Sequence, residues 1–285
     1  MATCKNWSSA IERVADLVNV MDRRQFLKGA GGVVGSLLAG PTMARSLTDV
    51  AGSRVINAVA FDALAIFDPR PVFATIQEAY PNQGKELCEA WRVRQFEYTW
   101  LRSTAHQYVD FWQVTQDALS YAAKKVHISL SSDDLRGFMD IYLKLGAWPD
   151  VLETLNHLKS EGFRLALLSN FTPIMLNSCV KSAGLGGMFD SLISTDMAKT
   201  FKPDPRAYQL GIDTLHVARD RILFVPFGAW DAAGAKQFGY KTFWVNRQNQ
   251  QPEELGVSPD GVGLSLEDLL RFLNTSLVEA RRTDT

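Results

Sequence analysis

The chain has 285 residues, of which 46% are hydrophobic and 21% are charged, and this composition excludes disorder, collagen and a coiled coil. Its 30 Lys and Arg residues balance 31 Asp and Glu residues, so the net charge of −1 provides no basic field for nucleic acid. Three cysteines, Cys4, Cys88 and Cys179, lack metal-ligand spacing and predict no disulfide framework.

The N-terminal region is typical of a targeting segment. Arg23 and Arg24 precede a Gly-rich apolar stretch, residues 29–40, that is too short to cross a bilayer about 30 Å thick. Paired arginines before such a stretch resemble a twin-arginine export signal. We therefore expect residues 1–44 to be a signal read by the twin-arginine export machinery, and the mature protein to be periplasmic. A basic N-terminus on a cytoplasmic protein is the alternative.

A strand and a long helical segment follow. Residues 55–61 form an apolar run that ends at Asp62, as expected for a buried strand. Residues 69–145 contain no comparable run, and their apolar residues recur three and four positions apart, which indicates helices. Ser131, followed by acidic residues, favours a helix start. We expect this segment to be a helical cap inserted after the first strand.

Strands and helices alternate in the rest of the chain. The further expected strands are residues 163–169, 222–226 and 241–246. The expected helices are residues 149–161, 173–183, 229–238 and 265–274, and glycine follows three of them. Alternation predicts the α/β class: a Rossmann-like parallel sheet with helices on both faces. This hydrolase core would be built from residues 53–68 and 146–275.

Polar residues from four segments would meet at one edge of this sheet. Ligand sites of open α/β sheets lie outside the carboxyl ends of the strands. Asp62, Ser169 with Asn170, and the loop to Asp231 follow three expected strands, and Lys202 lies in a connecting loop. Two carboxylates, a hydroxyl, an amide and an ammonium are a constellation suited to hydrolysis.

The arrangement resembles the haloacid dehalogenase superfamily, and within it the type II L-2-haloacid dehalogenases. The resemblance covers about residues 55–274. Its most specific part is the cap motif Trp91-Arg-Val-Arg-Gln-Phe-Glu-Tyr-Thr-Trp-Leu-Arg102. Supporting motifs lie at residues 166–170, 201–208 and 222–234.

The resemblance implies a hydrolase that acts on carbon–halide bonds. Asp62 would displace halide from a short 2-haloalkanoic acid, and water would open the resulting ester to a 2-hydroxy acid. Lys202 would neutralise and position Asp62 with support from Tyr208, Ser169 would assist as a hydrogen-bond donor, and Asp231 would orient the lysine or the water. No cofactor or metal is implied. The expected partners are the haloacid and water, and relatives suggest a homodimer.

The resemblance also assigns residues that would bind the substrate. Arg92 on the cap would hold the substrate or the departing halide, since a guanidinium is always charged and forks onto anions. Ser169 and Asn170 would donate hydrogen bonds to the substrate carboxylate, together with backbone amides near Ala63 and Leu64. Apolar lining would come from Phe96, Phe111 and Trp230.

The chain departs from the family pattern beside the nucleophile. The family motif Asp-x-Tyr-Gly-Thr-Leu has Ala65 and Ile66 at its Gly and Thr positions here, and Pro226 and Gly228 stand in a run that is usually Ser-Ser-Asn. Losing a polar partner beside a reacting group costs on the order of tenfold to a thousandfold in rate. We expect alkylation of Asp62 to survive better than ester hydrolysis, or the pocket to suit a different substrate.

Two other functions are alternatives to the dehalogenase. A catalytically impaired or noncatalytic member that binds a small carboxylate is favoured by the lost polar groups, whereas the retained charges of Asp62, Arg92, Lys202 and Asp231 favour an enzyme. A magnesium-dependent phosphatase is disfavoured, because such enzymes carry a second Asp where this chain has Leu64.

Overall fold

A computed structural model describes residues 56–283 of the chain. The expected export signal, residues 1–44, lies outside the described residues. Within residues 56–283, no helix combines the length and the apolar character that crossing a membrane would demand.

Six parallel strands form one sheet in the order β3-β2-β1-β4-β5-β6. The strands are β1 (Ala58–Phe61), β2 (Arg164–Ser169), β3 (Ser191–Ser194), β4 (Ile222–Val225), β5 (Lys241–Val245) and β6 (Gly261–Gly263). The first strand is central and pairs with β2 on one side and β4 on the other. The chain leaves β1 in both directions across the sheet, so the loops after β1, β2 and β4 meet at this switch in strand order.

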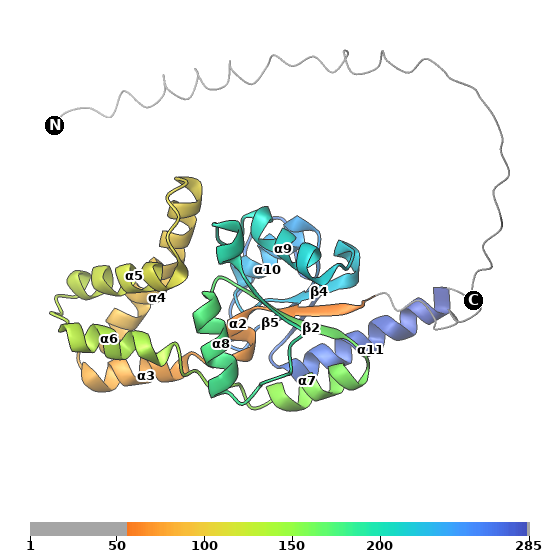
Figure 1. Ribbon diagram of the computed structural model, residues 1–285, viewed down its shortest axis with the longest axis horizontal. Helices are drawn as coiled ribbons and strands as arrows, with labels where there is room; N and C mark the ends of the chain where they lie inside the picture. Colours follow the sequence, from red (N-terminus) through yellow and green to blue (C-terminus); the bar gives the residue numbers. More distant parts are fainter. Residues whose placement is uncertain (1–55, 284–285) are drawn as a thin grey trace, which may run out of the picture. The chain divides into compact units, whose positions relative to one another are not determined.

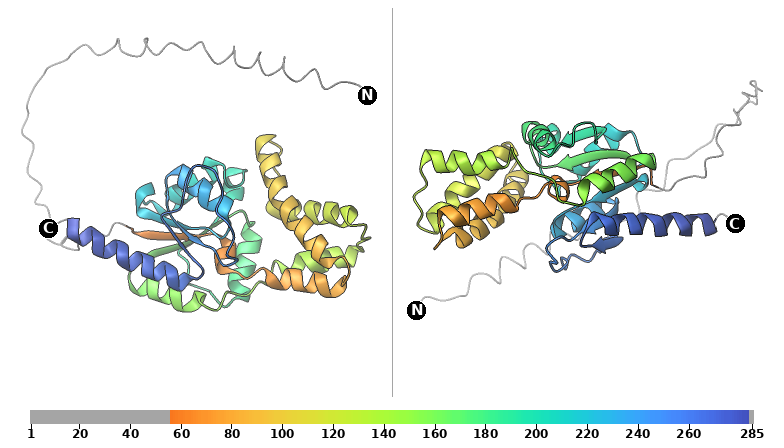
Figure 2. Two further views of the ribbon diagram at one scale, coloured as in Figure 1. Left: turned by 180° about the vertical axis from the view of Figure 1, so that it is seen from behind. Right: turned by 90° about the horizontal axis from the view of Figure 1, so that it is seen from below.

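Helices cover both faces of the sheet (Figures 1 and 2). One face carries α9 (Pro205–Leu215) and α10 (Ala229–Phe238), and the other carries α7 (Val151–Ser160), α8 (Pro173–Ser182) and α11 (Leu266–Thr283). Side chains of a strand alternate between the two layers. In β1, Ala58 and Ala60 pack beneath α9 and α10, whereas Val59 and Phe61 join the larger core on the other face.

Four helices follow β1 and its short helix α2 (Ala63–Ile66), and they pack against one another before the chain returns to the sheet (Figure 1). They are α3 (Arg70–Ala79), α4 (Gly84–Thr104), α5 (Phe111–Lys125) and α6 (Ser132–Ile141). The acidic start predicted at Ser131 is a capping box, in which the Ser131 and Asp134 side chains each accept a backbone N–H of the other residue.

The predicted α/β fold, with a parallel sheet and helices on both faces, is confirmed. Sequence reasoning did not find β3, β6 or α9. Both strands are only three or four residues long and partly exposed, so neither forms a clear apolar run. The last helix was expected to end at residue 274, but α11 continues to Thr283, because neither glycine nor proline follows to end it.

Candidate active site

Asp62 lies at the carboxyl end of the central strand. Its side chain caps α2, where Oδ2 accepts the Leu64 N–H at 3.0 Å, and its own N–H donates to the Val225 carbonyl of β4 at 3.0 Å. The side chain is 13% exposed. An N-cap residue has extended backbone geometry, so its carboxylate projects from the turn instead of packing along the helix. Asp62 is therefore both anchored and accessible.

A buried lysine lies between Asp62 and a second carboxylate. Lys202 Nζ donates to Asp62 Oδ1 at 2.8 Å and to Asp231 Oδ2 at 2.5 Å. The second oxygen of Asp231 accepts the Tyr208 hydroxyl at 2.7 Å. The Lys202 and Asp231 side chains are 1% and 2% exposed. The ammonium is thus fixed on the side of Asp62 that faces the core.

The charges of these groups depend on one another. Burial acts to lower the pKa of Lys202, but the charges of Asp231 and Asp62 outweigh it and raise that pKa above its usual value. Burial raises the pKa of Asp231 to about 6, against the lowering effect of the Lys202 charge. Burial and the Asp231 charge hold the pKa of Tyr208 well above its usual value. The raised pKa values of Lys202 and Tyr208 keep the lysine an ammonium and the tyrosine a neutral phenol at neutral pH.

Ser169 and Asn170, at the end of β2, also lie beside Asp62 and Lys202. Ser169 Oγ donates to Asp62 Oδ1 at 3.4 Å and accepts the Phe171 N–H at 3.2 Å. Asn170 Oδ1 accepts the Lys202 N–H at 3.0 Å and the Thr195 hydroxyl at 3.2 Å. Because the amide oxygen is engaged twice, Asn170 presents its NH2 group as the donor for a ligand.

Of the two backbone N–H groups expected to bind the substrate carboxylate, those of Ala63 and Leu64, one is already engaged within the protein. The Leu64 N–H is donated to Asp62 itself, which leaves the Ala63 N–H for a ligand. Leu64 lines the cavity at Asp62, whereas the Ala63 side chain is fully buried and Tyr208 contributes only through Asp231.

Helix α4 of the cap brings Arg92 to the same cavity. Arg92 is exposed, and its Nη1 donates to Gln248 Oε1 at 3.1 Å. Gln248 lies in the loop after β5, so this bond joins the cap to the core. The guanidinium keeps further donors free for an anion.

Asp62, Arg92, Ser169, Asn170, Lys202 and Asp231 all line one cavity of about 310 Å³. Its remaining wall is largely aromatic. Phe96 and Trp100 of α4 contact Trp230 of α10, with ring centroids 5.2 and 5.6 Å apart. Phe111, at the start of α5, stacks on Phe171 at 5.6 Å. The predicted lining residues Phe111 and Trp230 both face this cavity.

Of the four positions that depart from the family pattern, Ile66, Pro226 and Gly228 are those where the pattern has a polar side chain. Ile66 and Pro226 are buried and bring no polar side chain to the site. Gly228 lines the cavity, and a Cβ there would lie 2.9 Å from the Trp230 indole nitrogen. A larger residue at 228 would have to displace this indole, so the apolar wall and the small residue belong together.

The donor set suits an ammonium better than a metal ion at this position. Across residues 56–283, His, Cys, Asp and Glu side chains nowhere gather in groups of three or more that could hold a metal. Lys202 already fills the space between the carboxylates of Asp62 and Asp231.

Sequence reasoning missed several residues of this cavity, among them Tyr142, Phe227, Gln248, Gln250 and Glu253. One signal for three of them was available. The polar run that begins at Asn246 follows β5 directly, and polar residues after a parallel strand are candidates for the same site.

Comparisons with known proteins agree with this geometry. A family model described as haloacid dehalogenase-like hydrolase matches residues 36–239. The chain is 39% identical over 228 residues to an (S)-2-haloacid dehalogenase of Pseudomonas sp. (strain YL), a match that covers 80% of this chain and 98% of that protein.

Solved structures give the same result. A crystal structure of an L-2-haloacid dehalogenase matches with a TM-score of 0.76 and 40% identity, over 77% of this chain and 99% of that one. The L-2-haloacid dehalogenase of Xanthobacter autotrophicus, solved with chloropropionic acid covalently bound, matches with a TM-score of 0.72 and 33% identity, over 77% of this chain and 98% of that one.

Proposed function

The chain belongs to the haloacid dehalogenase-like hydrolases, and from that membership we propose that it is an (S)-2-haloacid dehalogenase. The observation that carries the proposal is the fixed contact of Lys202 with the accessible carboxylate of Asp62 at 2.8 Å. A carboxylate is a weak nucleophile, and orientation in a cavity shielded from water raises its effective reactivity.

The first step would be attack of an Asp62 carboxylate oxygen on C2 of a short 2-haloalkanoic acid. The carbon–halogen bond breaks, halide leaves with the bonding electrons, and C2 inverts as the ester forms. The Asn170 amide, the Ala63 N–H and the Ser169 hydroxyl, once it turns away from Asp62 Oδ1, would hold the substrate carboxylate. Arg92 supplies a positive charge on the cap side, where it can hold the substrate or the departing halide.

The second step would be hydrolysis of this ester. Water adds to the Asp62 carbonyl carbon, the bond to the 2-hydroxy acid breaks, and the Asp62 carboxylate is regenerated with release of a proton. Asp231, which holds Lys202, is the nearby carboxylate that can orient the lysine or the water.

Intact-protein mass spectrometry after incubation with L-2-chloropropionate, run beside a chloride-release assay, tests this function. We expect steady chloride release that is lost in Asp62→Asn, because an amide cannot form the ester in this way. If the unmodified protein yields neither chloride nor a mass increase, the proposal is contradicted for this substrate.

A second candidate function is a member that alkylates Asp62 but hydrolyses the ester poorly, or that only binds a small carboxylate. The apolar Ile66 and Pro226 beside Asp62, together with Gly228, favour it. In the same experiment, a persistent mass increase on Asp62 with one equivalent of chloride would identify the impaired enzyme. Protection of the fold by L-2-chloropropionate without chloride release would identify the binder.

We also propose that the protein is exported to the periplasm by the twin-arginine machinery. The support is the paired Arg23 and Arg24 ahead of a short, Gly-rich apolar stretch. Replacing both with lysine should keep the precursor in the cytoplasm, measured by cell fractionation and by the size of the protein. An unchanged distribution would refute export by this route.

A further inference from the structure

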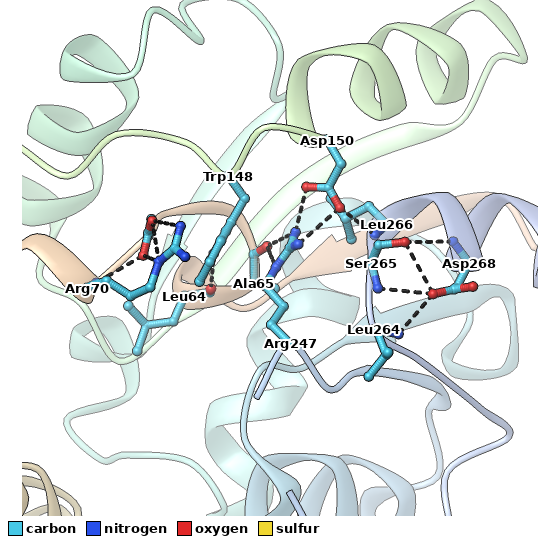
Figure 3. Close-up of polar contacts among 11 residues, drawn as sticks. Leu64, Ala65, Arg70, Trp148, Asp150, Arg247, Leu264, Ser265, Leu266 and Asp268 are labelled. Carbon is cyan, nitrogen blue, oxygen red and sulfur yellow. Dashed lines mark hydrogen bonds and ion pairs between the residues drawn. The ribbon is translucent and has the colours of Figure 1, made fainter. Parts of the chain in front are cut away.

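Helix α2, which begins directly after Asp62, cannot satisfy its own last carbonyl groups. A helix leaves its last four carbonyls without partners inside it, and α2 has only four residues. Two side chains from elsewhere supply donors (Figure 3). Trp148 Nε1 donates to the Leu64 carbonyl at 3.0 Å, and Arg247 Nη2 donates to the Ala65 carbonyl at 3.0 Å. The other two carbonyls, of Ala63 and Ile66, accept the backbone N–H groups of Phe67 at 2.7 Å and Trp148 at 3.0 Å. The Trp148 and Arg247 side chains therefore hold the middle two carbonyls of this turn.

Arg247 is itself held rigidly. Its Nη1 and Nη2 donate to the two carboxylate oxygens of Asp150 at 3.0 and 2.9 Å, and Asp150 also accepts the Leu266 N–H at 2.8 Å. The Arg247 and Asp150 side chains are 6% and 11% exposed. A two-pronged, buried contact of this kind fixes the plane of the guanidinium.

The Trp148 indole lies between two guanidinium groups (Figure 3). The Arg70 and Arg247 guanidinium carbons are 4.5 and 4.7 Å from the ring centroid. Stacked cations are attracted to an indole face and restrict its rotation. The two stacks therefore restrict the plane of the ring whose N–H donates to Leu64.

This stack is located where the cap joins the core. Arg70 is the first residue of α3, and Trp148 lies on the segment that returns from the cap. The two connecting segments are hydrogen-bonded to each other, since the Asp68 N–H donates to the Gly146 carbonyl at 2.9 Å. Arg247, by contrast, follows β5 in the core. The stack links both connections to the turn that carries the nucleophile.

We propose that Trp148 and Arg247 are positioning residues that aim the Asp62 carboxylate, an inference that rests on the proposed alkylation of Asp62. Neither side chain is among those that line the cavity around Asp62, so each acts through the α2 carbonyls. A misplacement of about 1 Å in a reacting group can cost about a hundredfold in rate. Their loss should therefore slow ester formation far more than it weakens substrate binding, to which α2 contributes only the Ala63 N–H.

The test uses two variants. Trp148→Phe keeps a ring between the guanidinium groups but loses the N–H, and Arg247→Lys keeps the charge but loses the two-pronged contact with Asp150. Ester formation with L-2-chloropropionate is followed by rapid quenching and intact mass. We expect the rate constant per active site to fall about tenfold to a hundredfold. The substrate concentration at half-maximal rate should stay within about twofold of the wild-type value, because Arg92, Ser169 and Asn170 are untouched and only the Ala63 N–H moves with α2.

Arg219→Lys is the matched control. Arg219 also stacks on an aromatic ring, Phe238, at 4.4 Å, and it also donates to a carbonyl at the end of a helix, that of Phe238 at 3.1 Å. It lies away from the carboxyl ends of the strands, before β4. This variant should form the ester at the wild-type rate.

Hydrogen–deuterium exchange provides a readout that does not need turnover. Peptides covering residues 61–67 should exchange faster in Trp148→Phe and Arg247→Lys than in the wild type or Arg219→Lys. If both variants merely unfold at a lower temperature, with wild-type ester formation per active site and wild-type exchange, the positioning role is wrong. If the wild type forms no ester, the proposed function fails. Independently of that result, wild-type exchange of residues 61–67 in both variants would refute the role of Trp148 and Arg247 in holding α2.

Discussion

Lys202 determines the charge balance of the site. Its ammonium contacts Asp62 and Asp231, and with 1% of its side chain exposed it has no access to bulk water. Removing one partner of such a buried pair leaves an uncompensated charge, which is costly. Asp231 therefore matters to Asp62 through the lysine, although the carboxylates do not bond to each other.

The pH dependence of the reaction should report this group. Burial raises the pKa of Asp231 to about 6, so below this pH Asp231 becomes neutral and can no longer balance Lys202. We expect kcat/KM for L-2-chloropropionate to rise with pH through about 6 and then level off. A pH–rate profile between pH 5 and 8 measures this.

Asp231→Asn is the control for this assignment. The amide cannot titrate, so the variant should have low activity without a limb near pH 6. A limb that stays at the same pH in Asp231→Asn would assign the ionisation to a different group.

At the scale of elements, β1 and the short helix α2 position the nucleophile of the site. Four buried residues of β1 end at Asp62, and the N-cap geometry of α2 turns its carboxylate toward the cavity. The 21-residue helix α4 then carries Arg92, Phe96 and Trp100 at helical spacing to the same cavity. Its apolar contacts with Trp230 of α10 hold the cap helix over the core.

At the scale of the whole molecule, the cavity is formed between cap and core. The Arg92–Gln248 hydrogen bond crosses this boundary, and Gln250 Nε2 also donates to Gln248 Oε1, at 2.9 Å. Gln248 thus fixes the guanidinium that would meet the anion. Arg92 is exposed, so one neutral partner contributes modestly to its orientation.

We expect Gln248→Met to raise the KM for L-2-chloropropionate about threefold to tenfold, equivalent to about 1 kcal/mol, and to leave kcat within about twofold. Steady-state kinetics measure both values. Gln209→Met, which removes an exposed glutamine contact with Asp213 on α9, is the control and should change neither. A fall in kcat alone would contradict the assigned role. The homodimer stays a prediction for light scattering to test.

The sequence by itself determined the alternation of strands and helices, the cap after the first strand and most of the polar residues of the cavity. These features depend on local patterns: an apolar run before Asp62, helical spacing through α4, and polar residues after strands. Short, partly exposed elements such as β3 and β6 gave no such pattern. The predicted roles of the site residues stay predictions until the variants are measured.

Only the tertiary structure decided which distant groups meet. Lys202 is 140 positions from Asp62 and contacts it, and Arg247 is 182 positions from Ala65 and donates to its carbonyl. No local pattern encodes such pairs, because they arise from the packing of whole elements around β1. The space at Gly228 is set in the same way, by an indole that folds back over it. The residue types therefore indicated a hydrolytic site and the family resemblance its chemistry, whereas the aim of the nucleophile depends on contacts between distant segments.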